Sequence, residues 1–180
     1  MAALVRFCSA CGHGLPSAPP VTCASCGTSH WLNPKPCANG IVVDGDRVLL
    51  ARRAYSPWKE LWGSPGGFVE GNEHPIETVE REVLEETGVR VAITGYLGVW
   101  VDRYADDPGD EDADVIDVGY YLARPEHTVG APDPAEVSEI GWFAWDDLPA
   151  ELAPPGTLDA VLAIARHATS PPVLDRPRGR

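Results

Sequence analysis

The stretch from Gly67 to Val89 reads GFVEGNEHPIETVEREVLEETGV and contains a clear helix pattern. Pro75 stands where a first helical turn tolerates proline, and Gly88 stands where a helix can end in a left-handed residue. Three apolar residues recur at spacings of three and four: Ile76, Val79 and Val83. The stretch therefore predicts an amphipathic helix over residues 74–87, preceded by a loop that contains glycine.

Three carboxylates are predicted to share one face of this helix. Glu82, Glu85 and Glu86 are spaced i, i+3 and i+4, so their side chains should point the same way. They would repel one another and cost helix stability unless a divalent cation neutralised them. Oxygen ligands suit Mg²⁺ or Mn²⁺ rather than zinc. Arg81 can orient a carboxylate through a bidentate hydrogen bond. The alternative interpretation is a solvated acidic helix face.

The same stretch is similar at every defined position to the Nudix box, G-x5-E-x7-R-E-U-x-E-E-x-G-U, in which U is apolar. The defined positions are Gly67, Glu73, Arg81, Glu82, Val83, Glu85, Glu86, Gly88 and Val89. The resemblance covers residues 37–150. It implies the Nudix fold, an α/β domain in which a mixed sheet is sandwiched between helices. Ser64 departs from the apolar residue of relatives, and we expect only a small packing change there.

The resemblance also implies hydrolysis of a nucleoside diphosphate linked to another group. The implied ligands of Mg²⁺ or Mn²⁺ are Glu82, Glu85, Glu86 and the carbonyl of Gly66. In such enzymes metal ions stabilise charge on the diphosphate while water attacks phosphorus, and a carboxylate accepts the proton of the water. We predict Glu85 as this base, with Glu136 or Glu139 as alternatives, and Arg81 completes the predicted catalytic set.

Cationic and aromatic residues near the box are candidates for substrate binding. Arg52 and Arg53 end a predicted strand, and one of them is expected to contact phosphate; a solvated charge pair is the alternative. Aromatic rings can stack on an adenine. Four lie near the expected mouth, with plain packing as the alternative for each: Trp58, Trp62, Trp100 and Tyr104. We predict that Trp62 and Tyr104 bind substrate.

Strand patterns surround the box on both sides. Ile41–Val43 and Val48–Leu50 flank Asp44-Gly45, which predicts a β-hairpin. Further strands are predicted over residues 91–104, 115–124 and 139–145, and a second helix over residues 157–167. We therefore expect one Nudix domain over residues 37–168. A mobile tail rich in Pro and Arg is expected over residues 169–180.

Four of the five cysteines form two pairs, Cys8-x2-Cys11 and Cys23-x2-Cys26. Each two-residue gap lets both thiolates turn toward one point, and the glycine after each pair permits the positive φ that this turn needs. Four thiolates suit a closed tetrahedral zinc site with a structural role. The alternative is a pair of disulfides. We predict a zinc ribbon over residues 1–36.

The residues around these pairs carry weaker signals. Asn33-Pro34-Lys35-Pro36 cannot be helical and offers few donors to a sheet, so it is predicted to be a stiff joint. Since four thiolates are already available, His13 and His30 are expected at the surface. Cys37 is expected to be a small buried residue without a chemical role.

The charge of the chain limits its partners. The sequence has 14 Lys and Arg against 27 Asp and Glu, a net charge of −13. Such a surface repels nucleic acid and anionic lipid, so nucleic-acid binding is not expected, although bound metal can still face a phosphate. No apolar run approaches the roughly 20 residues of a membrane span, and Met1–Phe7 is too short for a signal peptide. We expect a soluble cytoplasmic protein.

A four-cysteine ribbon ahead of a Nudix domain resembles the NADH pyrophosphatases. Their additional motif, S-Q-P-W-P-F-P-x-S, is absent from Val99–Tyr121. The chain thus resembles shorter ribbon-bearing Nudix proteins, and the expected substrates are ADP-ribose, FAD and related dinucleotides. The alternatives are a nucleoside triphosphate, a capped RNA end or NADH, and lastly a catalytically silent nucleotide sensor. The resemblance further implies a homodimer, because many members complete the nucleotide pocket from a second subunit.

Overall fold

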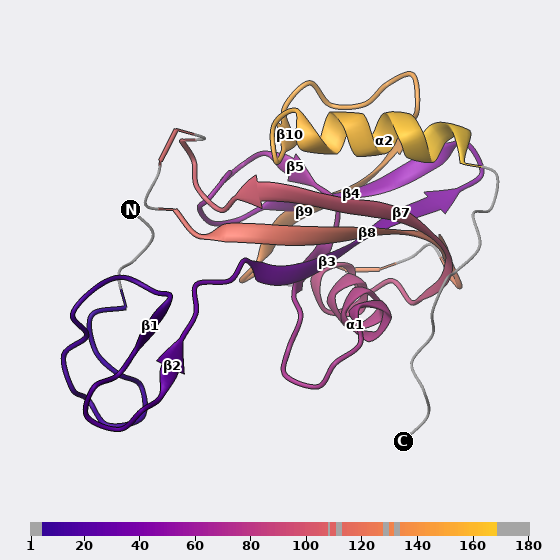
Figure 1. The fold of residues 1–180 in the computed structure, drawn as a ribbon. Helices are drawn as coiled ribbons and strands as arrows, with labels where there is room; N and C mark the ends of the chain where they lie inside the picture. The colour runs from indigo at the N-terminus through magenta and orange to yellow at the C-terminus, as the bar shows by residue number, and fades with distance from the viewer. Residues whose placement is uncertain (1–4, 108, 111–112, 128–129, 132–133, 169–180) are drawn as a thin grey trace.

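The computed structural model describes residues 5–107, 109–110, 113–127, 130–131 and 134–168. A mixed β-sheet lies between two helices, with α1 (Pro75–Thr87) on one face and α2 (Thr157–His167) on the other (Figure 1). This arrangement confirms the predicted α/β sandwich. Neither helix has the length and apolar character that crossing a membrane requires. The predicted tail over residues 169–180 lies outside the described residues.

Eight strands form this sheet in the described part of the chain. The main path runs through β10 (Leu152–Ala153), β5 (Trp62–Gly63), β4 (Arg47–Arg53), β3 (Lys35–Asp44), β8 (Val115–Pro125) and β7 (Val91–Arg103). In addition, β6 (Gly66–Phe68) pairs with β3, and β9 (Val137–Ala144) pairs with β4. The β3–β8 and β10–β5 pairs are parallel, and the other pairs are antiparallel.

Side chains of the central strands alternate between two apolar layers. Ile41, Val48 and Leu50 pack in a buried cluster with residues of α2. Val42 and Leu49 pack in a second cluster with Val79 and Val83 of α1. Because both faces are covered, consecutive strand residues can all be apolar. The predicted hairpin is confirmed, with Val43 opposite Val48.

Helix α1 begins at Pro75, one residue later than predicted, and ends at the predicted Thr87. The Nδ1 atom of His74 accepts a hydrogen bond from the amide of Ile76 at 3.2 Å, and the amide of His74 donates to the carboxylate of Glu77 at 2.8 Å. Gly88 takes a left-handed φ of 71° and donates to the carbonyl of Leu84 at 2.8 Å. These caps satisfy end groups of the helix that would otherwise lack partners, and they fix the helix beside β6.

A small cysteine-containing unit precedes the sheet. Its two strands, β1 (Val21–Thr22) and β2 (Ser29–His30), pair antiparallel (Figure 1). In both cysteine turns, the glycine amide donates back to the first cysteine carbonyl: Gly12 to Cys8 at 2.8 Å and Gly27 to Cys23 at 2.9 Å. The two glycines have φ values of 73° and 75°, which confirms the positive φ predicted for them.

Two details around this unit differ from the sequence-based expectation. His30 is only 9% exposed, so its predicted surface position is wrong; it alternates with exposed Ser29 along β2 and points inward. Strand β3 begins at Lys35, inside the segment predicted to be a joint, because Lys35 and Pro36 already pair with β8. The division of the chain at residue 36 stays a prediction.

Candidate active site

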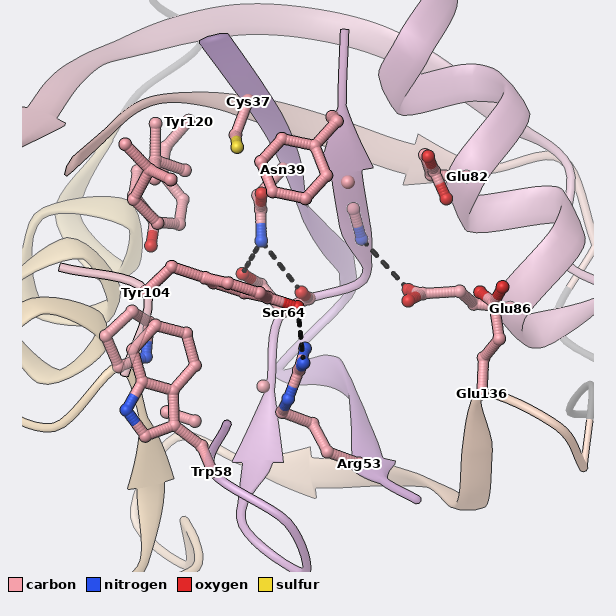
Figure 2. Close-up of a pocket in the computed structure, with 18 of the residues that line it drawn as sticks. Cys37, Asn39, Arg53, Trp58, Ser64, Glu82, Glu86, Tyr104, Tyr120 and Glu136 are labelled. Atoms are coloured by element: carbon pink, nitrogen blue, oxygen red, sulfur yellow. Dashed lines mark hydrogen bonds between the residues drawn. The ribbon is translucent and has the colours of Figure 1, made fainter. Parts of the chain in front are cut away.

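A pocket with a volume of about 280 Å³ opens beside α1. Figure 2 shows the carboxylates of Glu82, Glu86 and Glu136 on one side of this pocket. The aromatic side chains of Trp58, Tyr104 and Tyr120 lie on the other side, with Asn39 and Ser64 between the two groups. The pocket therefore has an acidic side and a largely neutral, aromatic side.

The acidic side combines two carboxylates of α1 with one from another segment. Oxygen atoms of Glu82, Glu86 and Glu136 all lie within 4.8 Å of one another. Glu85 lies outside this cluster: its side chain is 57% exposed and it pairs with Arg81 at 3.0 Å. Around the helix axis, Glu86 lies about 40° from Glu82, because four residues turn slightly more than one full turn. Glu85 lies about 60° from Glu82 in the other direction, because three residues turn less than one full turn. Glu82 and Glu86 therefore share the inner side, and Glu85 turns outward.

Strand β6 holds these carboxylates through close backbone approach. The amide of Gly66 donates to Oε2 of Glu86 at 2.9 Å. A Cβ atom on Gly67 would overlap the carboxylate of Glu82, so a larger residue at this position would displace that carboxylate. The carbonyl of Gly66 as a metal ligand stays a prediction; what the structure shows is that the amide of Gly66 binds Glu86.

Arg81 ties the loop before α1 to the helix. Its Nε and Nη2 atoms donate to the two oxygens of Glu73 at 2.8 and 3.0 Å, and Nη1 donates to Glu82 at 2.8 Å. The hydrogen bonds from Arg81 lower the pKa of Glu73 to about 2, so Glu73 stays ionised. The bidentate hydrogen bond predicted for Arg81 thus forms with Glu73, and Arg81 orients Glu82 at the same time.

The electrostatics of the acidic side favour a bound cation. Burial raises the pKa of Glu86 to about 8; the charge of Glu82 adds to this rise, and the hydrogen bond from Gly66 opposes it. Burial also raises the pKa of Glu82. Among the described residues that line the pocket, Arg53 is the only cation. Carboxylate oxygens grouped in this way suit Mg²⁺ or Mn²⁺ as ligands.

Arg53 lies in the pocket, and its neighbour Arg52 does not. The guanidinium of Arg53 donates to the carbonyl of Pro57 at 2.7 Å and to the hydroxyl of Tyr104 at 3.1 Å. It also lies over three aromatic rings, 4.9 to 5.9 Å from the centroids of Tyr55, Trp58 and Tyr104. These contacts fix its position. Arg52 instead pairs with Glu60 at 3.3 Å and Glu139 at 3.7 Å.

The four candidate aromatic residues divide into two pairs. Trp58 and Tyr104 line the pocket, and their rings meet edge to face at 5.5 Å. Trp62 packs against Phe143 at 4.8 Å and Trp100 packs against Tyr120 at 5.4 Å, and neither is among the described lining residues. The structure thus brings Tyr104 to the site and leaves Trp62 in the packing of the sheet.

Two polar residues of the pocket, Asn39 and Tyr120, were not predicted. The Nδ2 atom of Asn39 donates to the carbonyl of Ser64 at 3.0 Å and to its hydroxyl at 3.1 Å. Ser64 is 7% exposed, and its hydroxyl adds a partly buried hydrogen bond to Asn39 that an apolar residue could not make, besides any packing change. An asparagine within the otherwise small and apolar run Cys37–Val43 is the signal that could have singled out Asn39.

The four paired cysteines converge at a second site. The Sγ atoms of Cys8 and Cys26 lie 3.5 Å apart, and those of Cys11 and Cys23 lie 3.7 Å apart. All four sulfurs lie within 4.8 Å of one another, and all four cysteines are free rather than disulfide-bonded. Sulfurs about 2.3 Å from one tetrahedral ion would be about 3.8 Å apart, so the cluster can bind zinc. Cys37 is separate and buried, as predicted.

The sheet lies between two helices, and glutamates of α1 lie against the glycines of β6. This arrangement defines a Nudix-type site. The NUDIX domain family model matches residues 33–162. The chain therefore belongs to the Nudix family, which confirms the predicted resemblance.

Similar proteins agree with this membership. The ADP-ribose pyrophosphatase of Methanocaldococcus jannaschii is 33% identical over 119 residues, covering 66% of this chain and 67% of that protein. The NAD-capped RNA hydrolase NudC of Haemophilus influenzae strain PittGG is 31% identical over 173 residues, covering 91% of this chain. This chain spans only 60% of the length of that relative. The crystal structure of a NUDIX hydrolase from Nitrosomonas europaea matches with a TM-score of 0.75 and 26% identity, covering 93% of this chain and 96% of that chain.

Proposed function

We propose that this protein hydrolyses the diphosphate bond of a nucleoside diphosphate linked to another group, with ADP-ribose or FAD as the preferred kind of substrate. The observation that carries the proposal is the convergence of Glu82, Glu86 and Glu136 in a pocket that also holds Arg53. Carboxylates provide hard oxygen ligands for a divalent cation, and an arginine suits phosphate oxygens. The pocket therefore has the two kinds of group that diphosphate cleavage requires.

Glu82 and Glu86 are the proposed ligands of Mg²⁺ or Mn²⁺, and a carboxylate oxygen of Glu136 lies within 4.8 Å of theirs. Glu85 and the carbonyl of Gly66 stay further predicted ligands. A bound divalent cation supplies Lewis-acid stabilisation of negative charge on the diphosphate. Arg81 keeps Glu82 in place. Arg53, held by Pro57 and Tyr104, would bind a phosphate oxygen and orient the diphosphate.

The geometry favours Glu136 over Glu85 as the residue that accepts the proton of the attacking water. Glu136 lines the pocket, whereas Glu85 is mostly exposed and paired with Arg81. Glu139, the other alternative, pairs with Arg52 and is not among the described lining residues. A base must come within hydrogen-bond reach of the proton that it removes, and the position of Glu136 in the pocket lining supports it over the other two candidates.

The aromatic side of the pocket supports a substrate with a ring. Trp58 and Tyr104 provide ring surfaces, and a triphosphate would require more positive charge than Arg53 alone supplies. A second candidate is an NADH or NAD-capped RNA hydrolase, because the similarity to NudC extends over 91% of the chain. The missing S-Q-P-W-P-F-P-x-S motif and the net charge of −13 favour the first candidate. The homodimer and the cytoplasmic location stay predictions.

A substrate panel tests the proposal. With Mg²⁺, and separately with Mn²⁺, we expect ADP-ribose or FAD to be cleaved to AMP and the partner phosphate with a higher kcat/KM than NADH or any nucleoside triphosphate. The measurement is kcat/KM for each compound, with an NAD-capped RNA included. A tenfold preference for a triphosphate would overturn the proposal. A preference for NADH or the capped RNA would establish the second candidate instead.

We also propose that Cys8, Cys11, Cys23 and Cys26 bind one structural zinc ion. Cys23→Ser should lower the zinc content and unfold the cysteine-containing unit, because zinc ligation provides folding free energy in small metal domains. The sheet has its own buried clusters and should stay folded. The measurement is native mass spectrometry with amide spectra, and Cys37→Ser should keep its zinc as the matched control. A native mass with two disulfides and no zinc would contradict the site.

A further inference from the structure

We propose that Tyr120, on the side of the pocket opposite the carboxylates, and Asn39, in the middle of the pocket, form a neutral subsite that binds an uncharged nitrogen heterocycle, the base of the substrate. This inference rests on the proposed diphosphate hydrolysis and adds to it the position of the ring and the side chains that recognise it. Three observations carry it: the register of two strands, a buried hydroxyl without a partner, and an amide whose orientation is fixed.

The register of β3 and β8 places the two residues side by side. Asn39 lies opposite Tyr120, and Cys37 lies opposite Val118, in the parallel β3–β8 pair. Residues directly opposite each other project from the same face of a sheet. All four line the pocket. This part of the pocket wall is thus formed by the paired strands β3 and β8, which hold side chains more rigidly than a loop does.

The hydroxyl of Tyr120 is a buried hydrogen-bond donor without a partner among the described residues. Tyr120 is 0% exposed, and its hydroxyl has no hydrogen-bond partner among the described residues. Figure 2 shows it directed into the pocket. Burial raises the pKa of Tyr120, so the group stays protonated and can donate. Buried polar groups are almost always hydrogen-bonded, and a polar atom of a ligand in this pocket would supply the missing bond.

Asn39 supplies an acceptor beside this donor. Its amide nitrogen donates to the carbonyl oxygen of Ser64, which can only accept, and this contact fixes which way the amide faces. The side-chain oxygen of Asn39 is then the atom of the amide that can accept from a ligand. A donor and an acceptor close together match the edge of a nitrogen heterocycle, which carries both kinds of group.

The surroundings fit a flat, uncharged group better than a phosphate. Apolar residues complete this part of the lining: Ile116, Val118, Ala153 and Pro154. The volume of about 280 Å³ is just below the roughly 300–1,000 Å³ of ligand sites. It accommodates one end of a dinucleotide, so we infer that the base enters and the partner group extends into solvent.

The variant Tyr120→Phe tests the subsite because it removes only the hydroxyl. In calorimetric titrations with Mg²⁺, we expect AMP to bind the variant about tenfold more weakly than the wild type, equivalent to about 1.4 kcal/mol. Ribose 5-phosphate, which lacks the base, should bind both proteins equally. Reduced nicotinamide mononucleotide in place of AMP distinguishes a nicotinamide ring from an adenine ring. Tyr96→Phe is the matched control, since Tyr96 packs against Tyr121 at 5.1 Å outside the pocket lining and should not change AMP binding.

The outcomes separate the subsite from the proposed reaction. The melting temperature of Tyr120→Phe should equal or exceed that of the wild type, because the substitution deletes an unpartnered hydroxyl. Equal affinity of both proteins for each ring compound, or no binding of either compound by the wild type, would overturn the subsite. If AMP binding depends on Tyr120 but no diphosphate is hydrolysed, the subsite stands and the proposed reaction fails. If ADP-ribose is hydrolysed equally well by Tyr120→Phe, the reaction stands and the subsite fails.

Discussion

Replacing Glu86 with glutamine should lower kcat by about 100-fold or more, while KM changes less. Glu86 lies within 4.8 Å of Glu82 and Glu136 and is held by the amide of Gly66 at 2.9 Å. Glutamine keeps the size of the side chain but removes the negative charge, so the remaining ligands would bind the proposed cation more weakly. The measurement is steady-state hydrolysis of ADP-ribose over a range of Mg²⁺ concentrations.

The control for this result is Glu80→Gln, an exposed glutamate on the same helix, which should stay within about twofold of the wild type. Near-normal turnover of Glu86→Gln would contradict the metal assignment. Glu85→Gln and Glu136→Gln belong in the same series. A large loss of kcat in the Glu136 variant and a small one in the Glu85 variant would support Glu136 as the base, and the reverse would support Glu85.

Although Glu86→Gln should lower kcat, it should make the metal-free protein more stable at high pH. Glu86 has a pKa of about 8 in the fold against an ordinary value of 4.5. Because the folded state binds this proton more tightly, the stability linked to it is complete below about pH 4.5 and is lost as the pH rises toward 8. The melting temperature should therefore fall across this window, by about 2–4 °C per kcal/mol lost. Glu86→Gln should reduce the fall, and Mg²⁺ should restore the wild type at pH 8.

The sequence predicted the local parts of the site because their residues act within one loop and one helix. Glu73 and Arg81 are joined by two hydrogen bonds within the box itself, and the absence of a side chain at Gly67 leaves room for the carboxylate of Glu82. The caps of α1 also depend on adjacent residues, so the predicted bounds of the helix agree with the structure to within one residue. The same holds for each of the two cysteine turns, whose glycine amides donate back to the first cysteine of the turn.

The sequence could not predict the parts that depend on strand register. Asn39 and Tyr120 meet only because β3 pairs with β8 in one particular parallel register. The sequence named Glu136 as an alternative base, but not that it joins Glu82 and Glu86, which depends on the pairing of β9 with β4 that brings the segment before β9 beside the pocket. The spacing predicted that Glu85 points the same way as Glu82 and Glu86, but the packing of α1 on the sheet turns Glu85 outward, where it pairs with Arg81.

Arg53→Ala should lower kcat/KM by about 100-fold, because a hydrogen bond to a charged group contributes about 1.5–3 kcal/mol and each 1.4 kcal/mol is a factor of ten. Arg53 is the only cation among the described lining residues, and Pro57 and Tyr104 hold its guanidinium in place. Arg53→Lys should recover part of the loss, since lysine keeps the charge but lacks the planar fork.

Arg52→Ala is the matched control, because Arg52 is the adjacent residue on the same strand and is held outside the pocket by Glu60 and Glu139. Its kcat/KM should stay within about twofold of the wild type, as for most substitutions at the surface. Arg53 also contacts the rings of Tyr55 and Trp58, so the melting temperature of Arg53→Ala must be measured to separate lost phosphate binding from lost packing. A folded Arg53→Ala protein with normal kcat/KM would exclude the proposed phosphate contact. A loss confined to Arg52→Ala would move that contact to the neighbouring arginine.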